Sequence, residues 1–171
     1  AIWGSAFFAI KVGLNDFSPI GVASLRLIIA SIFLLFLFYI QKKQIIFSKQ
    51  VLVLLVIIGI VGNFIPFFLI SWAEQFIPSS TAGMLMAIGP IITLIMSHFL
   101  TKNEKFSLMK IISIAIGLIG VFFIFNINSF DNLFSSTSIE VYAKILVILA
   151  AFGYMFSNII AYEKLSNIDS F

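Results

Sequence analysis

The sequence contains no cysteine and only one histidine, His98, among its 171 residues. Without thiols the chain has neither a disulfide framework nor thiolate chemistry, and one imidazole cannot build a His-rich metal site. No stretch matches a His-Glu-x-x-His zinc motif, a glycine-rich phosphate loop or a Gly-x-Ser-x-Gly nucleophile elbow. These absences argue against an enzyme, and we expect no catalytic residue, no metal and no cofactor in this chain.

Charged residues are also scarce. They make up 10% of the sequence, whereas a soluble domain carries roughly 25%. Hydrophobic residues make up 61%, and the mean hydropathy is +1.18. The net charge is only +3, and the lysines lie in loops instead of forming a basic stripe, so we expect no nucleic-acid partner. This composition predicts a multi-pass membrane protein whose surroundings are the lipid bilayer.

Long apolar runs separated by short polar segments fill the chain. Most of these runs are about 20 residues long, enough to cross about 30 Å of hydrocarbon at 1.5 Å per residue. We therefore predict an all-α, polytopic bundle of transmembrane helices. The predicted helices span residues 1–14, 19–40, 51–72, 81–100, 106–125 and 141–162. The chain begins inside the first run and ends without a stop region, which we interpret as a fragment of a longer protein.

The fourth and fifth runs form the stretch around which we expect the chain to be organised. Their connection, residues 101–105, is too short for a domain, so the two helices should be antiparallel neighbours. Small residues on both helices let backbones approach closely in lipid, and a buried membrane helix tolerates a proline. The residues concerned are Gly83, Ala87, Gly89, Pro90, Ser113, Gly117 and Gly120. The pattern fits a generic helical hairpin as well as the core hairpin of a transporter.

Lysine placement predicts the orientation of the chain. The loops after the first, third and fifth helices contain no Lys or Arg, whereas those after the second and fourth helices are basic. By the positive-inside rule the basic loops are cytoplasmic and the N-terminus lies inside. We expect the protein to be integral to the cell's inner membrane. Lys11 and Lys144 lie near outer helix ends and are exceptions. The loop lysines are Lys42, Lys43, Lys49, Lys102 and Lys105.

A short internal similarity suggests a repeat. The segment Trp3-Gly4-Ser5-Ala6-Phe7 near the start has a counterpart in Phe152-Gly153-Tyr154-Met155-Phe156 of the sixth helix. Five helices separate the two segments, and because five is odd, a second copy would enter the membrane in the opposite orientation. Inverted repeats of this kind are typical of carriers, whose substrate site lies near the membrane midplane between the halves.

In their order and spacing, several motifs resemble the EamA family of the drug/metabolite transporter superfamily. The matching residues are Trp3-Gly4-Ser5, Lys11, Pro19 and Arg26, then Trp72-Ala73-Glu74-Gln75-Phe76 and Ser79-Ser80-Thr81-Ala82-Gly83, then Pro90, Glu104, Gly117 and Gly120. Among these, the resemblance implies a structural role for Gly4, Pro19, Pro90, Glu104, Gly117 and Gly120. It further implies a ten-helix carrier of two five-helix repeats that moves small organic metabolites, such as amino acids, outward by alternating access.

On this resemblance, residues 1–126 are the first repeat, with its first helix truncated. Residues 127–140 are a polar external loop, and residues 141–171 begin a second, inverted repeat. The expected partners are a small-molecule substrate and the missing C-terminal repeat of the same chain. Whether the protein forms a homodimer is left open by the sequence.

Arg26 is the leading candidate for the substrate pathway. It is the only arginine in the sequence and lies seven residues into the second predicted helix. At 1.5 Å per residue, this position is about 10 Å deep in the membrane. A mid-membrane arginine costs roughly 2.5 to 3.5 kcal/mol on insertion scales, so it should face the bundle or a watery cavity. Two hypotheses stand equally: a structural arginine satisfied by carbonyls, or a group of the transport pathway.

Six further residues are candidates for the same pathway. Lys11 can instead snorkel to the outer interface. Glu74 is either a solvated loop residue or a vestibule carboxylate that takes up protons. The tryptophans and asparagines can be interfacial or packing residues. The six candidates are Trp3, Lys11, Asn63, Trp72, Glu74 and Asn158.

Two other function classes remain as alternatives. A membrane-embedded enzyme, such as a lipid-modifying transferase, should show clustered carboxylates or histidines at one membrane face. A non-transporting scaffold should lack polar groups inside the bundle, and Arg26, Asn63 and Asn158 argue against it. The substrate and the coupling ion do not follow from the sequence.

Overall fold

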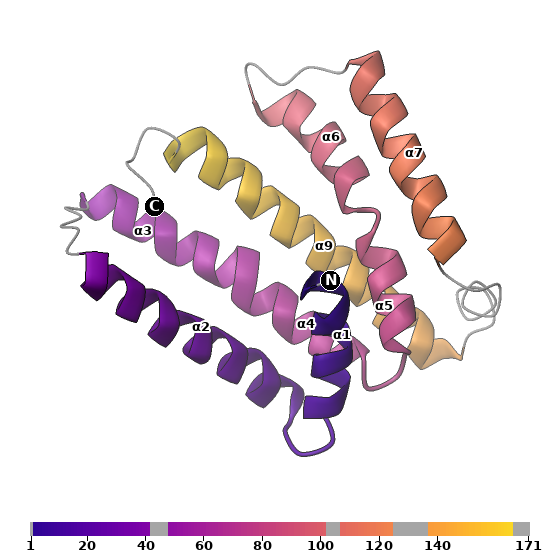
Figure 1. The fold of residues 1–171 in the computed structure, drawn as a ribbon, viewed down its shortest axis with the longest axis horizontal. Helices are drawn as coiled ribbons and strands as arrows, with labels where there is room; N and C mark the ends of the chain where they lie inside the picture. The colour runs from indigo at the N-terminus through magenta and orange to yellow at the C-terminus, as the bar shows by residue number, and fades with distance from the viewer. Residues whose placement is uncertain (1, 42–47, 102–106, 125–136, 166–171) are drawn as a thin grey trace.

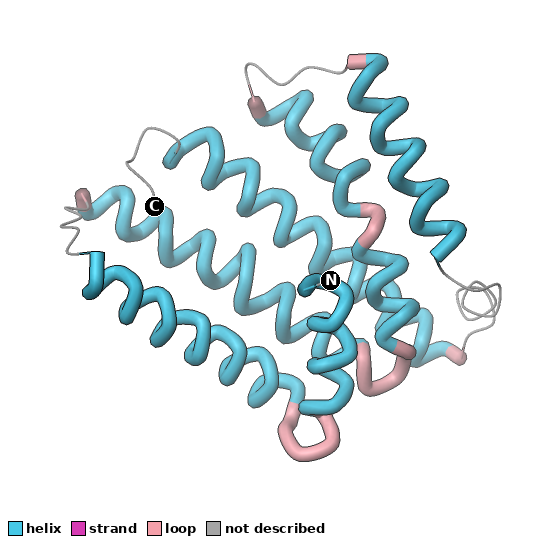
Figure 2. The backbone as a smooth tube through the Cα atoms, viewed as in Figure 1, coloured by secondary structure: helices cyan, strands magenta, loops and turns pink. Residues whose placement is uncertain are grey.

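The computed structural model describes residues 2–41, 48–101, 107–124 and 137–165. Throughout these ranges the chain is helix or turn, with no strand, which confirms the all-α prediction (Figures 1 and 2). The helices are α1 (Ile2–Gly13), α2 (Pro19–Gln41), α3 (Lys49–Gly59), η1 (Ile60–Phe64), α4 (Ile65–Ala73), α5 (Ser79–Met86), α6 (Gly89–Leu100), α7 (Leu108–Ile124) and α9 (Ser138–Leu165).

Four helical segments within the described ranges are long and apolar enough to cross a membrane. Two of them are composite, because α3, η1 and α4 follow one another without a break and α5 leads directly into α6. α1 and α7 are shorter apolar helices. The four segments are Pro19–Gln41, Lys49–Ala73, Ser79–Leu100 and Ser138–Leu165. The polytopic helical bundle expected from the sequence is therefore confirmed.

Local chemistry explains where these helices begin. Pro19 occupies the first position of α2, where the missing N–H of proline costs nothing. Ser48 caps α3, since its Oγ accepts a hydrogen bond from the backbone N–H of Val51 at 3.3 Å. These starts lie within two residues of the predicted ones.

The third span widens into a π-helical turn, η1, just before Pro66. The backbone N–H of Ile65 bonds the carbonyl of Ile60, five residues back, instead of the carbonyl four residues back. Pro66 has no N–H to donate, and its ring crowds the preceding turn of a regular α-helix. The π turn accommodates it, and such turns in helices are frequent at functional sites.

The fourth span is broken, which corrects the prediction of one continuous helix over residues 81–100. α5 ends at Met86, and the N–H of Ala87 closes its last turn on the carbonyl of Gly83 at 3.1 Å. α6 starts at Gly89 with Pro90 in its first turn. In a continuous helix, the ring of Pro90 would clash with the carbonyl of Met86, so the chain restarts the helix instead.

α9 is the central helix of the structure, and it packs along α4, η1, α5 and α6 (Figure 1). Glycines allow this close approach. A Cβ added to Gly62 would lie 2.3 Å from the Cβ of Ser157, and one added to Gly153 would lie 3.1 Å from the Val61 carbonyl oxygen. Small residues thus bring helix backbones together, as expected in lipid. The close contacts lie between α9 and its neighbours, and not between the fourth and fifth predicted helices.

The fourth and fifth helices are neighbours, as expected, but the glycine packing expected between them does not occur among the described residues. A Cβ added to Gly117 or Gly120 of α7 would meet nothing within 4 Å. A hollow of about 470 Å³, lined in part by Pro90 and Ser113, lies between α6 and α7. Figure 1 shows α7 at the edge of the bundle, beside α6. The fifth helix is therefore peripheral, and its glycines serve no contact within the described residues.

Candidate functional site

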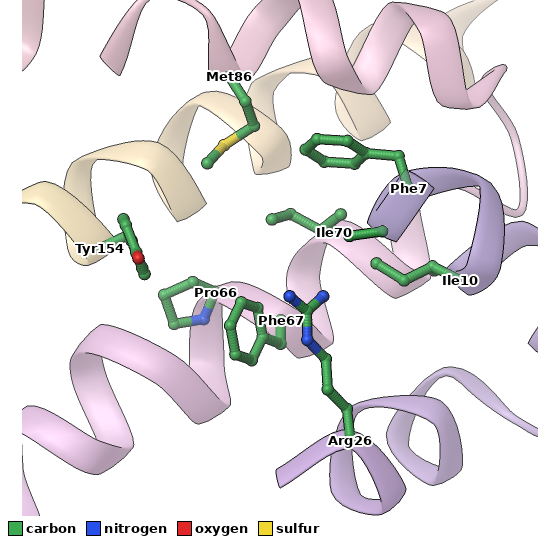
Figure 3. A pocket seen from close by; sticks show the side chains of 9 residues that line it. Phe7, Ile10, Arg26, Pro66, Phe67, Ile70, Met86 and Tyr154 are labelled. Carbon is green, nitrogen blue, oxygen red and sulfur yellow. The ribbon is translucent and has the colours of Figure 1, made fainter. Parts of the chain in front are cut away.

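Arg26 projects from α2 towards α4. Its Cζ lies 4.1 Å from the ring centroid of Phe67, which is a cation–π contact. Figure 3 shows the guanidinium beside Phe67 and pointing towards Ile70. The side chain is half-buried, so the charge lies inside the bundle and not on its lipid-facing surface.

The Arg26 head lies at the wall of a small pocket formed by five helices: α1, α2, α4, α5 and α9. Apart from Tyr154 of α9, the other side chains that line the pocket are apolar, so they offer the guanidinium few hydrogen-bond acceptors. The free space is about 10 Å³, room for about one water molecule. In this conformation the pocket is closed to a metabolite. The residues that line it are Ala6, Phe7, Ile10, Arg26, Pro66, Phe67, Ile70, Met86 and Tyr154.

A second polar site surrounds Glu74, at the turn between α4 and α5. The Glu74 side chain is fully buried, with 0% exposure, which excludes the alternative of a solvated loop residue. Its Oε2 accepts a hydrogen bond from the Ser79 hydroxyl at 3.4 Å. Its Oε1 is buried with no hydrogen-bond partner among the described residues, as are the hydroxyls of Ser71 and Thr81.

Lys11 connects α1 to this turn. Its ammonium donates hydrogen bonds to the backbone carbonyls of Glu74 and, at 3.5 Å, Ile77. The stem of Lys11 is exposed, but its charged head is held by the end of α4 instead of extending freely to the interface.

Burial governs the protonation of the Glu74 carboxyl. Removing the carboxylate from water raises the pKa of Glu74 from 4.5 to about 7, against the lowering effects of the Ser79 hydrogen bond and the Lys11 charge. Charged and neutral forms therefore lie close in free energy near neutral pH. A group poised in this way is suited to exchange protons.

The remaining candidates lie elsewhere. Trp72 packs on Phe76 with ring centroids 4.8 Å apart, and both contact the core around Ala73. Asn63 is half-buried in η1, and Asn158 lies on the exposed side of α9, where it lines a separate groove with Thr93. Neither asparagine lines the Arg26 pocket. Trp3 lies in α1, in a part whose side chains the structure does not describe, and Glu104 lies outside the described residues.

Sequence reasoning missed several residues that the fold brings to these sites. Phe67 looks like any other aromatic of an apolar run, and only the packing of α2 on α4 places it under Arg26. Ser71 and Thr81 are short hydroxyl residues without a motif. Tyr154 had a signal, because it belongs to the segment that repeats the start of the chain.

Comparison with known proteins supplies a family and relatives. A family model described as the EamA-like transporter family matches residues 1–126. The chain is 27% identical over 168 residues to the uncharacterized transporter YoaV of Bacillus subtilis, covering 98% of this chain and 56% of the relative. It is 28% identical over 160 residues to the uncharacterized inner membrane transporter YedA of Escherichia coli K12. That match covers 92% of this chain and 49% of the relative.

A third relative is the protein PagO of Salmonella typhimurium, 28% identical over 116 residues, which cover 68% of this chain and 38% of the relative. The chain therefore spans about half the length of the curated relatives it matches. No solved structure matches it.

Proposed function

The chain belongs to the EamA-like transporter family, and on that premise we propose that it forms the first repeat and the start of the second in a ten-helix secondary carrier. The carrier exports small organic metabolites, such as amino acids, by alternating access. It lies in the inner membrane with its basic loops in the cytoplasm, and it is completed by a C-terminal repeat.

The observation that carries this proposal is the position of Arg26. It is a charged residue within a membrane span, and its head lies at a pocket whose walls come from α1, α2, α4, α5 and α9. In the proposed architecture α9 opens the second repeat, so the pocket lies where the two repeats meet. Substrate sites of inverted-repeat carriers occupy this junction.

The chemistry of the pocket favours a substrate with a carboxylate. Arginine presents five donors in a planar fork that matches a carboxylate in bidentate geometry. Phe67 covers one face of the guanidinium and leaves its edges for hydrogen bonding (Figure 3). An ionic hydrogen bond contributes about 1.5 to 3 kcal/mol, which corresponds to about a 10- to 100-fold effect on affinity.

Alternating access needs elements that bend, and two of them flank the pocket. Met86 is the last residue of α5, directly before the break ahead of Pro90, and Pro66 follows the π turn η1. Breaks of this kind localise backbone rotation. We infer that the closed pocket, with room for one water, is one end state and that bending at these points opens it.

The test is transport by the full-length protein in proteoliposomes, with a set of radiolabelled amino acids as probes. Arg26→Ala and Arg26→Lys should insert and fold normally, while their apparent affinity for the transported amino acid falls about 10- to 100-fold. Leu25→Ala, at the adjacent exposed position, is the control. Unchanged transport by Arg26→Ala would remove Arg26 from the mechanism. If the wild-type protein transports none of the amino acids tested, this result would count against amino acid transport.

A further inference from the structure

The buried polar cluster around Glu74 is not explained by helix packing. Four side chains carry it: Ser71 and Glu74 on α4 and its end, and Ser79 and Thr81 in the first turn of α5. Ser71 and Glu74 are three residues apart, so they share one face of the helix. Ser71, Glu74 and Thr81 are each at least 99% buried and each has an oxygen without a hydrogen-bond partner among the described residues.

Burying such groups is costly unless their hydrogen bonds are made. An unpaired buried hydroxyl costs about 1 to 3 kcal/mol, and an unpaired buried carboxylate costs more. Lys11 does not remove this cost, because its ammonium bonds the backbone carbonyls of Glu74 and Ile77 and not the carboxylate oxygens. The ionised carboxylate is therefore poorly accommodated in this conformation.

A neutral carboxyl fits the cluster better. With a proton on Oε1, Glu74 no longer buries a full negative charge at an oxygen that has no hydrogen-bond partner among the described residues. Oε2 still accepts from Ser79. Protonation thus removes the largest cost of burying this side chain.

We propose that this cluster is a reversible proton-binding site, in which Glu74 takes up the proton on Oε1 while Ser79 hydrogen-bonds its other oxygen. The step is simple: a proton from the aqueous face forms an O–H bond at Oε1, and its return to water breaks that bond. This inference rests on the proposed carrier function and names the coupling ion of the carrier as a proton.

The charges around the site are few. α1 contributes Lys11, α5 carries no titratable residue, and the neighbouring end of α9 contributes Glu140 and Lys144. Asp16 lies in the turn between α1 and α2. Burial raises the pKa of Glu74 to about 7, with Ser79 and Lys11 opposing it. The site can therefore load and release a proton within the physiological range.

The cluster lies on the elements that wall the Arg26 pocket. Ile70, directly before Ser71, lines that pocket from α4, and Met86 lines it from α5. Glu74 and Ser79 link the two helices through their hydrogen bond. The Ser79 hydrogen bond is stronger to a carboxylate than to a neutral carboxyl. Proton occupancy therefore changes the strength of the bond between α4 and α5 and biases the conformation of the pocket, which is the differential interaction that coupling requires.

The first experiment measures proton binding directly. Infrared difference spectra of the full-length protein in nanodiscs, recorded across a pH titration, should show a protonated carboxyl band that titrates near pH 7. Glu74→Gln should lack this band, and Glu163→Gln, at an exposed position of α9, should retain it. Ser79→Ala should raise the midpoint, because it removes the hydrogen bond to Oε2 that favours the ionised form.

The results that overturn the inference are distinct. If Glu74 titrates below about pH 5, as an ordinary carboxyl does, the site is not poised for proton exchange. If the band responds to Na⁺ at constant pH instead of to pH, the site binds a metal cation and the proposal is wrong.

A second experiment separates this inference from the carrier function itself. In proteoliposomes with the wild-type protein, an imposed pH gradient should accelerate uptake of the transported amino acid. Glu74→Gln should still exchange the amino acid across the membrane, but the pH gradient should no longer accelerate its uptake. Flux that ignores the pH gradient in both proteins overturns proton coupling while the carrier function stands. Absence of any flux counts against the carrier function, and the infrared titration still decides whether the proton site exists.

Discussion

At the residue scale, single atoms decide how closely the helices approach. A Cβ added to Gly62 would lie 2.3 Å from the Cβ of Ser157 on α9, whereas Gly117 has open space around it. We expect Gly62→Ala to destabilise the protein by about 1 to 3 kcal/mol, because α9 must shift. Gly117→Ala should be neutral or slightly stabilising, since alanine favours the helix. Thermal unfolding in detergent measures both, and equal melting temperatures would contradict the contact between η1 and α9.

The carboxyl of Glu74 makes a second residue-scale prediction, on stability against pH. Its pKa is about 7 in the fold and 4.5 as the ordinary value. Between these values the unfolded chain releases the proton and the folded chain keeps it, so the free energy of unfolding falls as pH rises from about 4.5 to about 7. The fall is on the order of 1 to 3 kcal/mol and levels off above that window.

Melting temperatures across this pH range measure the effect. Glu74→Gln cannot ionise, so its curve should be flatter than that of the wild type, while Glu163→Gln should follow the wild type. If the Glu74→Gln and wild-type curves run parallel, the buried carboxyl does not titrate within the window.

At the scale of elements, the break between α5 and α6 is the feature with the clearest consequence. Pro90 forces the helix to restart, and Met86, at the end of α5, lines the Arg26 pocket. Pro90→Ala removes the clash and restores a possible helical hydrogen bond, so the span should become straighter. We expect insertion to be normal and transport to fall several-fold.

Spin labels on either side of the break, at half-buried Ser80 and exposed Ile95, report this change through the distance between them. A longer and narrower distance distribution in Pro90→Ala is the expected result. An unchanged distribution together with unchanged transport would show that the break is not a hinge. Ile116→Ala, on the lipid-exposed side of peripheral α7, is a control that should change neither quantity.

At the scale of the whole molecule, the proposed orientation places the α1–α2 turn outside and the start of α3 in the cytoplasm. Single cysteines at Ser18 and Ser48 test it, because both positions are exposed and the chain has no cysteine of its own. Ser18→Cys should react with an impermeant thiol reagent in intact cells. Ser48→Cys should react only after the cytoplasm is opened, and labelling of both from outside would contradict the orientation.

Much of the architecture followed from the sequence alone. Low charge, high hydropathy and runs of about 20 residues predicted the helical spans, and the predicted second helix begins at Pro19, as α2 does. The physical reason is strict: in hydrocarbon the backbone must satisfy its hydrogen bonds within each segment, so length and apolarity determine a helix without reference to its neighbours. The family resemblance rested on motif order and was confirmed over residues 1–126.

Only the tertiary structure decided which helix is central and which polar groups are buried. Membrane helices are apolar all round, so their periodicity does not reveal which face meets a neighbour. For that reason Gly117 and Gly120 looked like contact residues but make no close contact within the described part of the chain, while Gly62 and Gly153 let α9 into the middle of the bundle. Glu74 looked equally suited to water in its turn, and the packing of α1, α5 and α9 around the end of α4 buried it.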